Sequence, residues 1–202
     1  MGARQDAWGI IADRFEEAYG PKAASPGWPR VQRLAAAIDG RVLDLACGAG
    51  YELSLFGRGV GIDSSSGMLA AARERAPRAG LVLGDVRWLP FRAATFAAAI
   101  SCFALIHLTK RDLTAMLASL RPLLRPGAAV ETSFFAGSGE RDTTFSTISG
   151  DALAHYSYYE PGELSEMFAA AGFANVRVER DVLHEPTLDI ACLFVSAEVP
   201  EQ

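Results

Sequence analysis

The sequence predicts an α/β fold, a doubly wound and mainly parallel sheet of seven strands preceded by N-terminal helices. From Arg41 onward, short apolar runs alternate with segments whose apolar residues recur at helical spacing. The run from Phe96 to Cys102 is apolar almost throughout, which is typical of a strand covered on both faces. With 202 residues, the chain is long enough for one domain with a sizeable core.

Two helices are expected before the first strand. Apolar residues sit at helical spacing in two groups: Trp8, Ile11, Ala12, Phe15 and Tyr19, and then Val31, Leu34, Ala35 and Ile38. The segment between them, residues 20–29, is dense in glycine and proline and is expected to be a loop.

The strands and helices of the sheet follow in order. Strands are expected at Val42–Ala46, Gly59–Asp63, Leu81–Asp85, Phe96–Cys102, Ala128–Phe135, Val176–Glu179 and Ile190–Val195. Helices are expected after Gly50, after a cap at Ser64, Ser65 or Ser66, over Leu113–Leu120, and over Gly162–Ala171 with Gly172 at its end. Residues 136–160 lack firm periodicity and are expected to form a loop over the site.

Composition and charge favour a soluble cytoplasmic protein. The three cysteines, at positions 47, 102 and 192, are far apart and suit neither a disulfide framework nor a metal site. Neither a signal peptide nor a membrane-spanning segment is visible in the sequence. The formal charge of −5 makes nucleic acid an unlikely partner.

Polar residues follow three successive predicted strands. The first strand contains Asp44 near its end and leads into the turn Ala46-Cys47-Gly48-Ala49-Gly50, whose glycines allow a ligand to approach the backbone closely. Asp63 ends the second strand, where a carboxylate can bind ribose hydroxyls, and Asp85 ends the third. Each acid also has a purely structural interpretation, Asp63 as a helix cap and Asp85 as a turn residue. Together they indicate a nucleoside site.

These segments resemble the class I S-adenosylmethionine-dependent methyltransferases, in particular the small-molecule branch of ubiquinone-biosynthesis-type enzymes. The resemblance covers Arg41 to about Val178. It rests on Val42 to Gly50, Gly61-Ile62-Asp63-Ser64-Ser65-Ser66-Gly67-Met68-Leu69, Gly84 to Phe91, and Leu124-Arg125-Pro126-Gly127. It implies the Rossmann-like methyltransferase fold, with S-adenosylmethionine as cofactor and S-adenosylhomocysteine as product.

The resemblance also implies roles for individual residues. The loop Ala46, Cys47, Gly48 to Gly50 would wrap the methionine part of the cofactor, with Asp44 supporting its amino group. Asp63 and the adjacent Ser64 would hold the ribose, and Met68 would pack near the adenine. Asp85 and the Val86 amide would bind the adenine, while Ser101 and Cys102 would border the sulfonium. An N-terminal helix would fold over the cofactor, which could bring Tyr19 to the site.

Two residues of this chain depart from the family pattern. Ala46 stands where glycine is frequent, which is expected to be a mild change, and Ala97 replaces a frequent aspartate of the fourth strand.

An NAD site is the competing interpretation. Its fingerprint requires a third glycine where this chain has Leu53, and it leaves Asp85 without a task.

The reaction expected is an in-line methyl transfer to an O, N or C atom of a small molecule, governed mainly by positioning. His107 is the candidate base, although it can equally be an inert histidine packed at a helix start. Tyr156 and Tyr159, in a cluster with His155 and Tyr158, are candidates for an acceptor pocket. A cofactor-binding protein without transferase activity and an NAD-dependent oxidoreductase are the alternatives.

The expected organisation is a single methyltransferase domain over residues 1–202, working as a monomer or homodimer and holding no metal. Residues 1–40 would form a helical cover and residues 41–135 the cofactor-binding core. Residues 136–160 would lie on the substrate side, and residues 161–202 would supply the last helix and strands.

Overall fold

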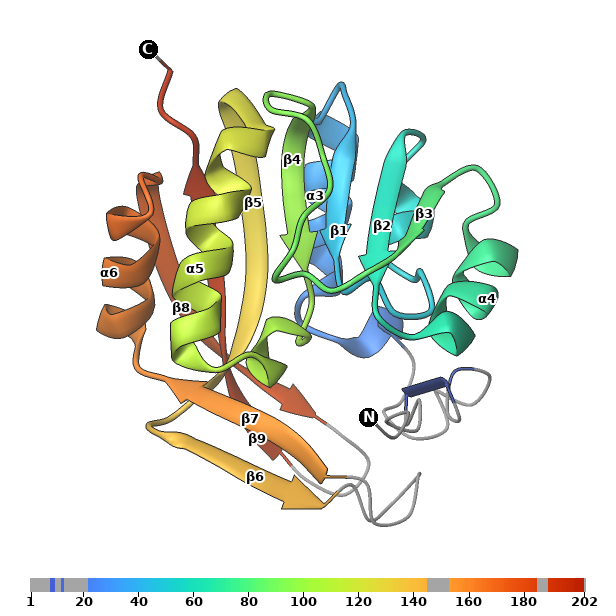
Figure 1. Cartoon of the computed structure of the whole chain (residues 1–202). Helices are drawn as coiled ribbons and strands as arrows, with labels where there is room; N and C mark the ends of the chain where they lie inside the picture. Colours follow the sequence, from blue (N-terminus) through green and yellow to red (C-terminus); the bar gives the residue numbers. More distant parts are fainter. Residues whose placement is uncertain (1–7, 10–11, 13–21, 145–152, 185–188, 202) are drawn as a thin grey trace.

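The computed structural model describes residues 8–9, 12, 22–144, 153–184 and 189–201 (Figure 1). Its strands are β1 (Val42–Leu45), β2 (Gly59–Asp63), β3 (Gly80–Leu83), β4 (Phe96–Ser101), β5 (Leu124–Ala136), β6 (Glu140–Thr144), β7 (Leu153–Tyr159), β8 (Ala174–His184) and β9 (Asp189–Glu198). Its helices include α3 (Trp28–Ala37), α4 (Ser66–Arg75), α5 (Lys110–Leu120) and α6 (Pro161–Ala170). The 3-10 turns are η2 (Lys22–Ala24), η3 (Leu53–Leu55), η4 (Leu105–His107) and η5 (Arg121–Leu123).

The sheet has the doubly wound order expected from the sequence. Its strands run in the order β3-β2-β1-β4-β5-β7-β6, with β9 paired to β5 and β8 paired to β9. The pairs β1–β2, β1–β4, β2–β3 and β4–β5 are all parallel, whereas β9 runs antiparallel to β5. The order reverses beside β1, because β2 and β4 flank it on opposite sides. The predicted fold class is confirmed.

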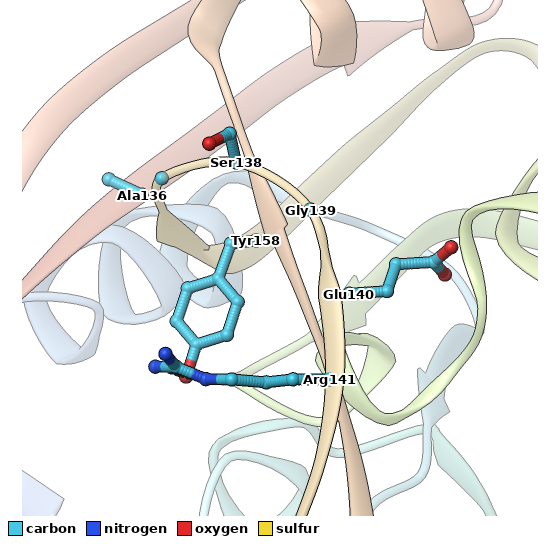
Figure 2. Close-up of a pocket in the computed structure, with 7 residues that line it drawn as sticks. Ala136, Ser138, Gly139, Glu140, Arg141 and Tyr158 are labelled. Atoms are coloured by element: carbon cyan, nitrogen blue, oxygen red, sulfur yellow. Dashed lines mark hydrogen bonds between the residues drawn. The ribbon is translucent and has the colours of Figure 1, made fainter.

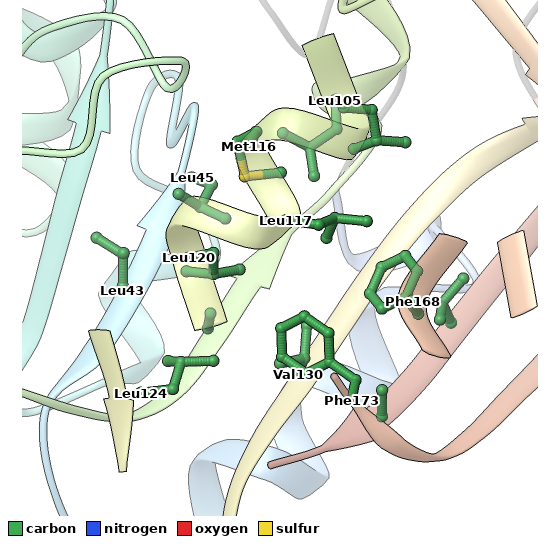
Figure 3. Close-up of a cluster of buried hydrophobic side chains, with 14 of the residues drawn as sticks. Leu43, Leu45, Leu105, Met116, Leu117, Leu120, Leu124, Val130, Phe168 and Phe173 are labelled. Carbon is green, nitrogen blue, oxygen red and sulfur yellow. The ribbon is translucent and has the colours of Figure 1, made fainter. Parts of the chain in front are cut away.

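Alternate residues of the buried strands feed two cores. Leu43 and Ala99 pack with α5 and α6 in the larger cluster, while Val42, Ala98 and Ile100 pack with α3 on the other face. Figure 3 shows Leu43 and Leu45 of β1 meeting Met116 and Leu120 of α5. Burial on both faces explains why these strands read as continuous apolar runs.

In the part of the chain that the structure describes, the sheet has nine strands rather than seven, because the segment expected to be a loop contains two of them. β6 and β7 form an antiparallel hairpin, and β7 also pairs in parallel with the end of β5. Figure 1 shows this hairpin extending beyond the carboxyl end of the sheet. The sequence Glu140-Arg141-Asp142-Thr143-Thr144 has no apolar residue, so it shows none of the hydrophobic alternation by which strands are recognised.

The expected helix after Gly50 is also absent, since only the 3-10 turn η3 forms there. Gly57 follows too soon for a helix of ordinary length, and Leu53 instead anchors the turn in the core with no exposed surface.

The other helix ends follow the expected signals. Ser65 caps α4 by accepting a hydrogen bond from the Met68 amide, and Gly172 ends α6 at a φ angle of 86°. Within the described residues, no helix is long and apolar enough to cross a membrane.

Candidate functional site

The turn after β1 lies at the reversal point of the sheet, where ligands bind in open α/β folds. Three of its five residues have left-handed φ angles: 54° at Ala46, 50° at Gly48 and 77° at Gly50. The Cys47 amide donates to the Ile62 carbonyl over 3.1 Å, which fastens the turn to the end of β2. The sequence therefore builds a tight, fixed turn at the carboxyl edge of β1.

Ala46 is a costlier departure from glycine than its small side chain suggests. Its φ angle of 54° lies in the region where a Cβ atom crowds the following carbonyl oxygen. Side-chain size alone predicts a mild change. The change is larger than that, because glycine is favoured at this position by the backbone conformation and not by the small volume.

Gly50 is required by both its conformation and its surroundings. A Cβ atom there would lie 2.9 Å from the Cβ of Ala72 in α4. Gly48 is open by comparison, since its Cβ would meet only the Met68 sulfur at 3.9 Å. The Gly48 position can therefore accept a close ligand, while Gly50 seats the turn on α4.

Asp63 links this turn to the start of α4. One carboxylate oxygen accepts from the Gly48 amide and the other from the Ser65 amide, each over 2.8 Å. The residue is only 8% exposed. Asp63 thus joins the turn to the start of α4, a structural role in addition to the expected ribose contact. Its position beside the turn is compatible with both roles.

The neighbours of Asp63 divide between surface and interior. Ser64 is exposed, whereas Met68 is buried beneath the turn and packs with Ala49. The Cys47 side chain points inward to Gly61, where an added Cβ would come within 2.5 Å of its sulfur. Burial and the charge of Asp44 raise the pKa of the Cys47 thiol, so it stays protonated and only its backbone is suited to bind a ligand.

Asp85 follows β3 and faces Arg87. Its Oδ1 accepts from the Arg87 amide over 2.9 Å, and its Oδ2 accepts from Nη2 over 2.5 Å. These bonds hold the pKa of Asp85 below its usual value, so the carboxylate is ionised and can accept from an amino group. The adjacent Val86 is buried in the larger core.

Ser101 and Cys102 differ from what their position after β4 suggested. The Ser101 hydroxyl donates to the Leu45 carbonyl over 2.8 Å, and the residue has no exposed surface. Ser101 therefore joins β4 to β1 and does not border an open site, which corrects the expected contact with the sulfonium. Cys102 is half-buried and packs against the α3-side cluster.

Phe103, which sequence reasoning missed, carries backbone strain at the same edge. Its φ angle is 52°, unusual for a bulky residue, and its amide donates to the Ser133 hydroxyl of β5 over 2.9 Å. Its ring packs against Phe135 and Phe194. Strain of this kind concentrates at binding sites, but no sequence signal marks it.

One ring nitrogen of His107 is committed to a hydrogen bond. Nδ1 lies 2.9 Å from the His155 carbonyl oxygen, which can only accept, so Nδ1 carries the proton and Nε2 is the basic atom. The ring contacts Trp8 at 5.1 Å and Tyr156 at 4.7 Å between centroids. Burial lowers the pKa of His107, which keeps the ring neutral at pH 7.

One face of the hairpin fixes the segment that supports His107. His155 Nδ1 contacts Asp142 at 2.9 Å, and the buried Ser157 hydroxyl donates to the Leu108 carbonyl over 2.8 Å. The Glu140 carboxylate accepts from the Lys110 amide, which lowers its pKa. These contacts bind the hairpin to η4 and the start of α5.

The tyrosines of β7 alternate between two environments. Tyr159 has no exposed surface and packs against Phe134 in the core, so its expected place in an acceptor pocket is wrong. Burial raises the pKa of its hydroxyl. Tyr156 is partly exposed and contacts His107 and Phe135. Tyr19 lies outside the described residues.

A cavity of about 330 Å³ lies beside the turn between β5 and β6. Its lining runs from Ala136 to Arg141 and includes Tyr158. Figure 2 shows Arg141 running beneath the Tyr158 ring while the Glu140 side chain points away to the other side. Sequence reasoning missed Arg141, which could have been found only by pairing it with Tyr156 across the hairpin.

Known proteins match part of this chain in sequence. Residues 42–127 match the model of a family described as a methyltransferase domain. The chain is 38% identical over 96 residues to a dTDP-3-amino-3,4,6-trideoxy-alpha-D-glucopyranose N,N-dimethyltransferase of Streptomyces venezuelae, a match that covers 44% of this chain and 40% of the relative. The matched segments thus span less than half the length of the curated relatives.

Solved structures extend the similarity to the whole fold. A complex of DhpI with SAH has a TM-score of 0.74 and 22% identity, with 98% of this chain and 96% of the other covered. A Burkholderia thailandensis 1,6-didemethyltoxoflavin-N1-methyltransferase, solved with 1,6-didemethyltoxoflavin and S-adenosylhomocysteine, has a TM-score of 0.67 and 21% identity, with 100% and 92% covered. The fold predicted from the sequence is confirmed.

Proposed function

We infer that this chain, whose residues 42–127 match the methyltransferase domain family, transfers a methyl group from S-adenosylmethionine to a small-molecule acceptor. One arrangement carries the inference. The turn at Gly48, the carboxylate of Asp63 and the carboxylate of Asp85 follow three adjacent parallel strands at the reversal point of the sheet.

The described residues suit this cofactor. The open space at Gly48 allows the methionine part to approach the backbone, and Asp44 lies in β1 just before the turn. Asp63 and the exposed Ser64 would hold the ribose, and the ionised Asp85 would accept from the adenine amino group. Trp8 packs with Ala49 and Met68, so its side chain lies against the turn.

When bound, the cofactor supplies a methyl group already activated by its sulfonium. The protein then has to align the acceptor, exclude water and, where the acceptor loses a proton, receive it. The Nε2 atom of His107 can receive that proton because Nδ1 is already protonated. His107 would be the general base, and Tyr156 against its ring would border the acceptor.

An NAD-dependent oxidoreductase is the weaker alternative. A dinucleotide site places the pyrophosphate at the N-terminus of a helix that begins at the glycine turn. Here η3 has three residues and Leu53 is fully buried. Melting temperature separates the two: S-adenosylhomocysteine is expected to raise it, and NAD to leave it unchanged.

The wider assignments belong to the same proposal. The relative from Streptomyces venezuelae is named for an N,N-dimethylation and the toxoflavin enzyme for an N1-methylation, which supports a small-molecule acceptor. The formal charge of −5 favours such an acceptor over nucleic acid. The three free cysteines favour a reducing compartment such as the cytoplasm. A single domain that works as a monomer or homodimer is part of the same proposal.

The direct test is transfer of a labelled methyl group from S-adenosylmethionine into a metabolite extract. A labelled product is expected with the wild-type chain, and a strongly reduced yield with Asp63→Ala. Binding of the cofactor without any labelled product would instead favour a cofactor-binding protein that performs no transfer.

A further inference from the structure

We propose that the acceptor carries an oxyanion group, a carboxylate or a phosphate, which Arg141 binds at the cavity beside the β5–β6 turn. Its flat body would lie across Tyr156 and Phe135. This inference rests on the proposed methyl transfer and adds the chemical class of the acceptor.

A continuous row of rings connects the candidate base to this cavity. Tyr156 contacts His107 at 4.7 Å and stacks on Phe135 at 6.1 Å with an interplanar angle of 14°. Phe135 in turn contacts Tyr158 at 6.1 Å. Such half-buried aromatic faces favour a flat apolar ligand.

The hairpin brings Arg141 to the far end of this row. Arg141 is paired with Tyr156 across the two strands, and side chains of directly opposed residues share a face of a sheet. Tyr158 lies two residues beyond Tyr156 and so returns to that face. The opposite face is occupied by His155 and Ser157, whose contacts run to Asp142 and Leu108.

The Arg141 side chain is oriented by Tyr158, and no described residue neutralises its charge. Its guanidinium carbon lies 4.3 Å from the centre of the Tyr158 ring, and Nη2 donates to the Tyr158 hydroxyl over 2.6 Å. Among the described residues, no carboxylate lies within ion-pair distance of it. The adjacent Glu140 is held by the Lys110 amide and Ser157 instead.

This cavity is open to solvent and its lining is mostly polar, which suits a charged group better than an apolar one. Its volume of about 330 Å³ falls in the range of small-molecule sites, roughly 300–1,000 Å³. Ser138 adds an exposed hydroxyl and Gly139 adds exposed backbone, whereas Gly137 is half-buried and donates its amide to Tyr159. A planar guanidinium fixed by stacking loses little freedom on binding a carboxylate or phosphate.

The test uses three probes that share one ring system: 2-naphthoate, 2-naphthyl phosphate and the uncharged 2-naphthamide. Calorimetry on the full chain, with and without S-adenosylhomocysteine, gives their affinities for the wild type, Arg141→Met and Arg141→Lys. Arg177→Met is the matched control, since Arg177 is an exposed arginine on β8, a strand that pairs with β9 and not with the hairpin.

At least one anion is expected to bind the wild type and Arg177→Met about tenfold more tightly than the amide. That preference should disappear in Arg141→Met, persist in part in Arg141→Lys, and leave the affinity for S-adenosylhomocysteine unchanged. The tighter of the two anions identifies the group as carboxylate or phosphate.

Three results would overturn the proposal: no probe binds, the amide binds the wild type as tightly as both anions, or Arg141→Met keeps the anion preference. The wild-type comparison needs no variant, so a folding defect in Arg141→Met does not weaken it. Absence of S-adenosylhomocysteine binding by the wild type would overturn the proposed methyl transfer instead, while the anion preference stays measurable without that ligand.

Discussion

The Nδ1 atom of His107 lies 2.9 Å from the carbonyl oxygen of His155, and this contact decides which nitrogen of the ring is basic. A carbonyl oxygen accepts only, so Nδ1 must carry a proton and Nε2 is left with its lone pair. The same hairpin strand that provides the carbonyl also places Tyr156 against the ring. The fold therefore positions a neutral histidine with a defined tautomer beside the aromatic row.

His107→Gln is expected to lower kcat by about 10²- to 10⁴-fold on an acceptor that must lose a proton, the usual size of general-base catalysis. The wild-type rate should fall as the pH drops through the pKa of His107, which burial places below 6.5, and the variant should lack that pH dependence. Rate measurements across pH check this. His184→Gln, which alters an exposed ring, is the control and should keep the wild-type profile.

His107 should also make stability depend on pH. Because burial lowers its pKa in the fold below the ordinary 6.5, the unfolded chain binds the proton more readily. The stabilisation is therefore present above pH 6.5 and is lost as the pH falls through the folded-state pKa. Melting temperatures at pH 7.5 and 5.5 should differ less for His107→Gln than for the wild type. If the melting temperature changed equally with pH in the two proteins, the lowered pKa of His107 would be contradicted.

Ala46→Gly is expected to stabilise the fold by about 1 kcal/mol, since it relieves a left-handed φ of 54° at some cost in unfolded-state entropy. Ala71→Gly, within α4, is the matched control and should destabilise by about 1 kcal/mol. Urea unfolding measures both free energies. If Ala→Gly raises the free energy of unfolding at position 46 and lowers it at position 71, backbone conformation is the cause. Equal losses of stability at both positions would refute this explanation.

Gly50→Ala should destabilise more than Gly139→Ala, although the two glycines share nearly the same φ angle, 77° and 80°. Backbone strain of about 1–2 kcal/mol applies to both. Only at Gly50 does the new Cβ come within 2.9 Å of Ala72, because nothing lies within 4 Å at Gly139. The clash should add about 1–3 kcal/mol to the change in unfolding free energy. If both variants lost the same unfolding free energy, the turn would be shown to move away from α4 at no cost.

The parallel core could be predicted from sequence because strands buried on both faces show it directly. β1, β2 and β4 appear as short apolar runs, and the acids at positions 63 and 85 mark where two strands end or have just ended. Gly172 was correctly placed at the end of α6 because its positive φ is what a helix end requires. These features depend on local composition alone.

The acceptor side could not be predicted, because its residues are placed by strand pairing. Once residues 153–159 are known to form a strand, alternation separates Tyr156 and Tyr158 from the buried Tyr159. Without that knowledge the three tyrosines look equivalent. The structural role of Ser101 cannot be read from the sequence for a similar reason, since its hydrogen bond to Leu45 joins strands that are distant in sequence.

Binding of S-adenosylhomocysteine, measured by calorimetry, tests the central claim most directly. The wild type should bind it, Asp63→Ala should bind at least about tenfold more weakly, and Asp39→Ala, an exposed aspartate, should match the wild type. Circular dichroism confirms that each variant is folded. A wild-type chain that shows no binding, or a folded Asp63→Ala with undiminished affinity, would contradict the assignment of this turn as a cofactor site.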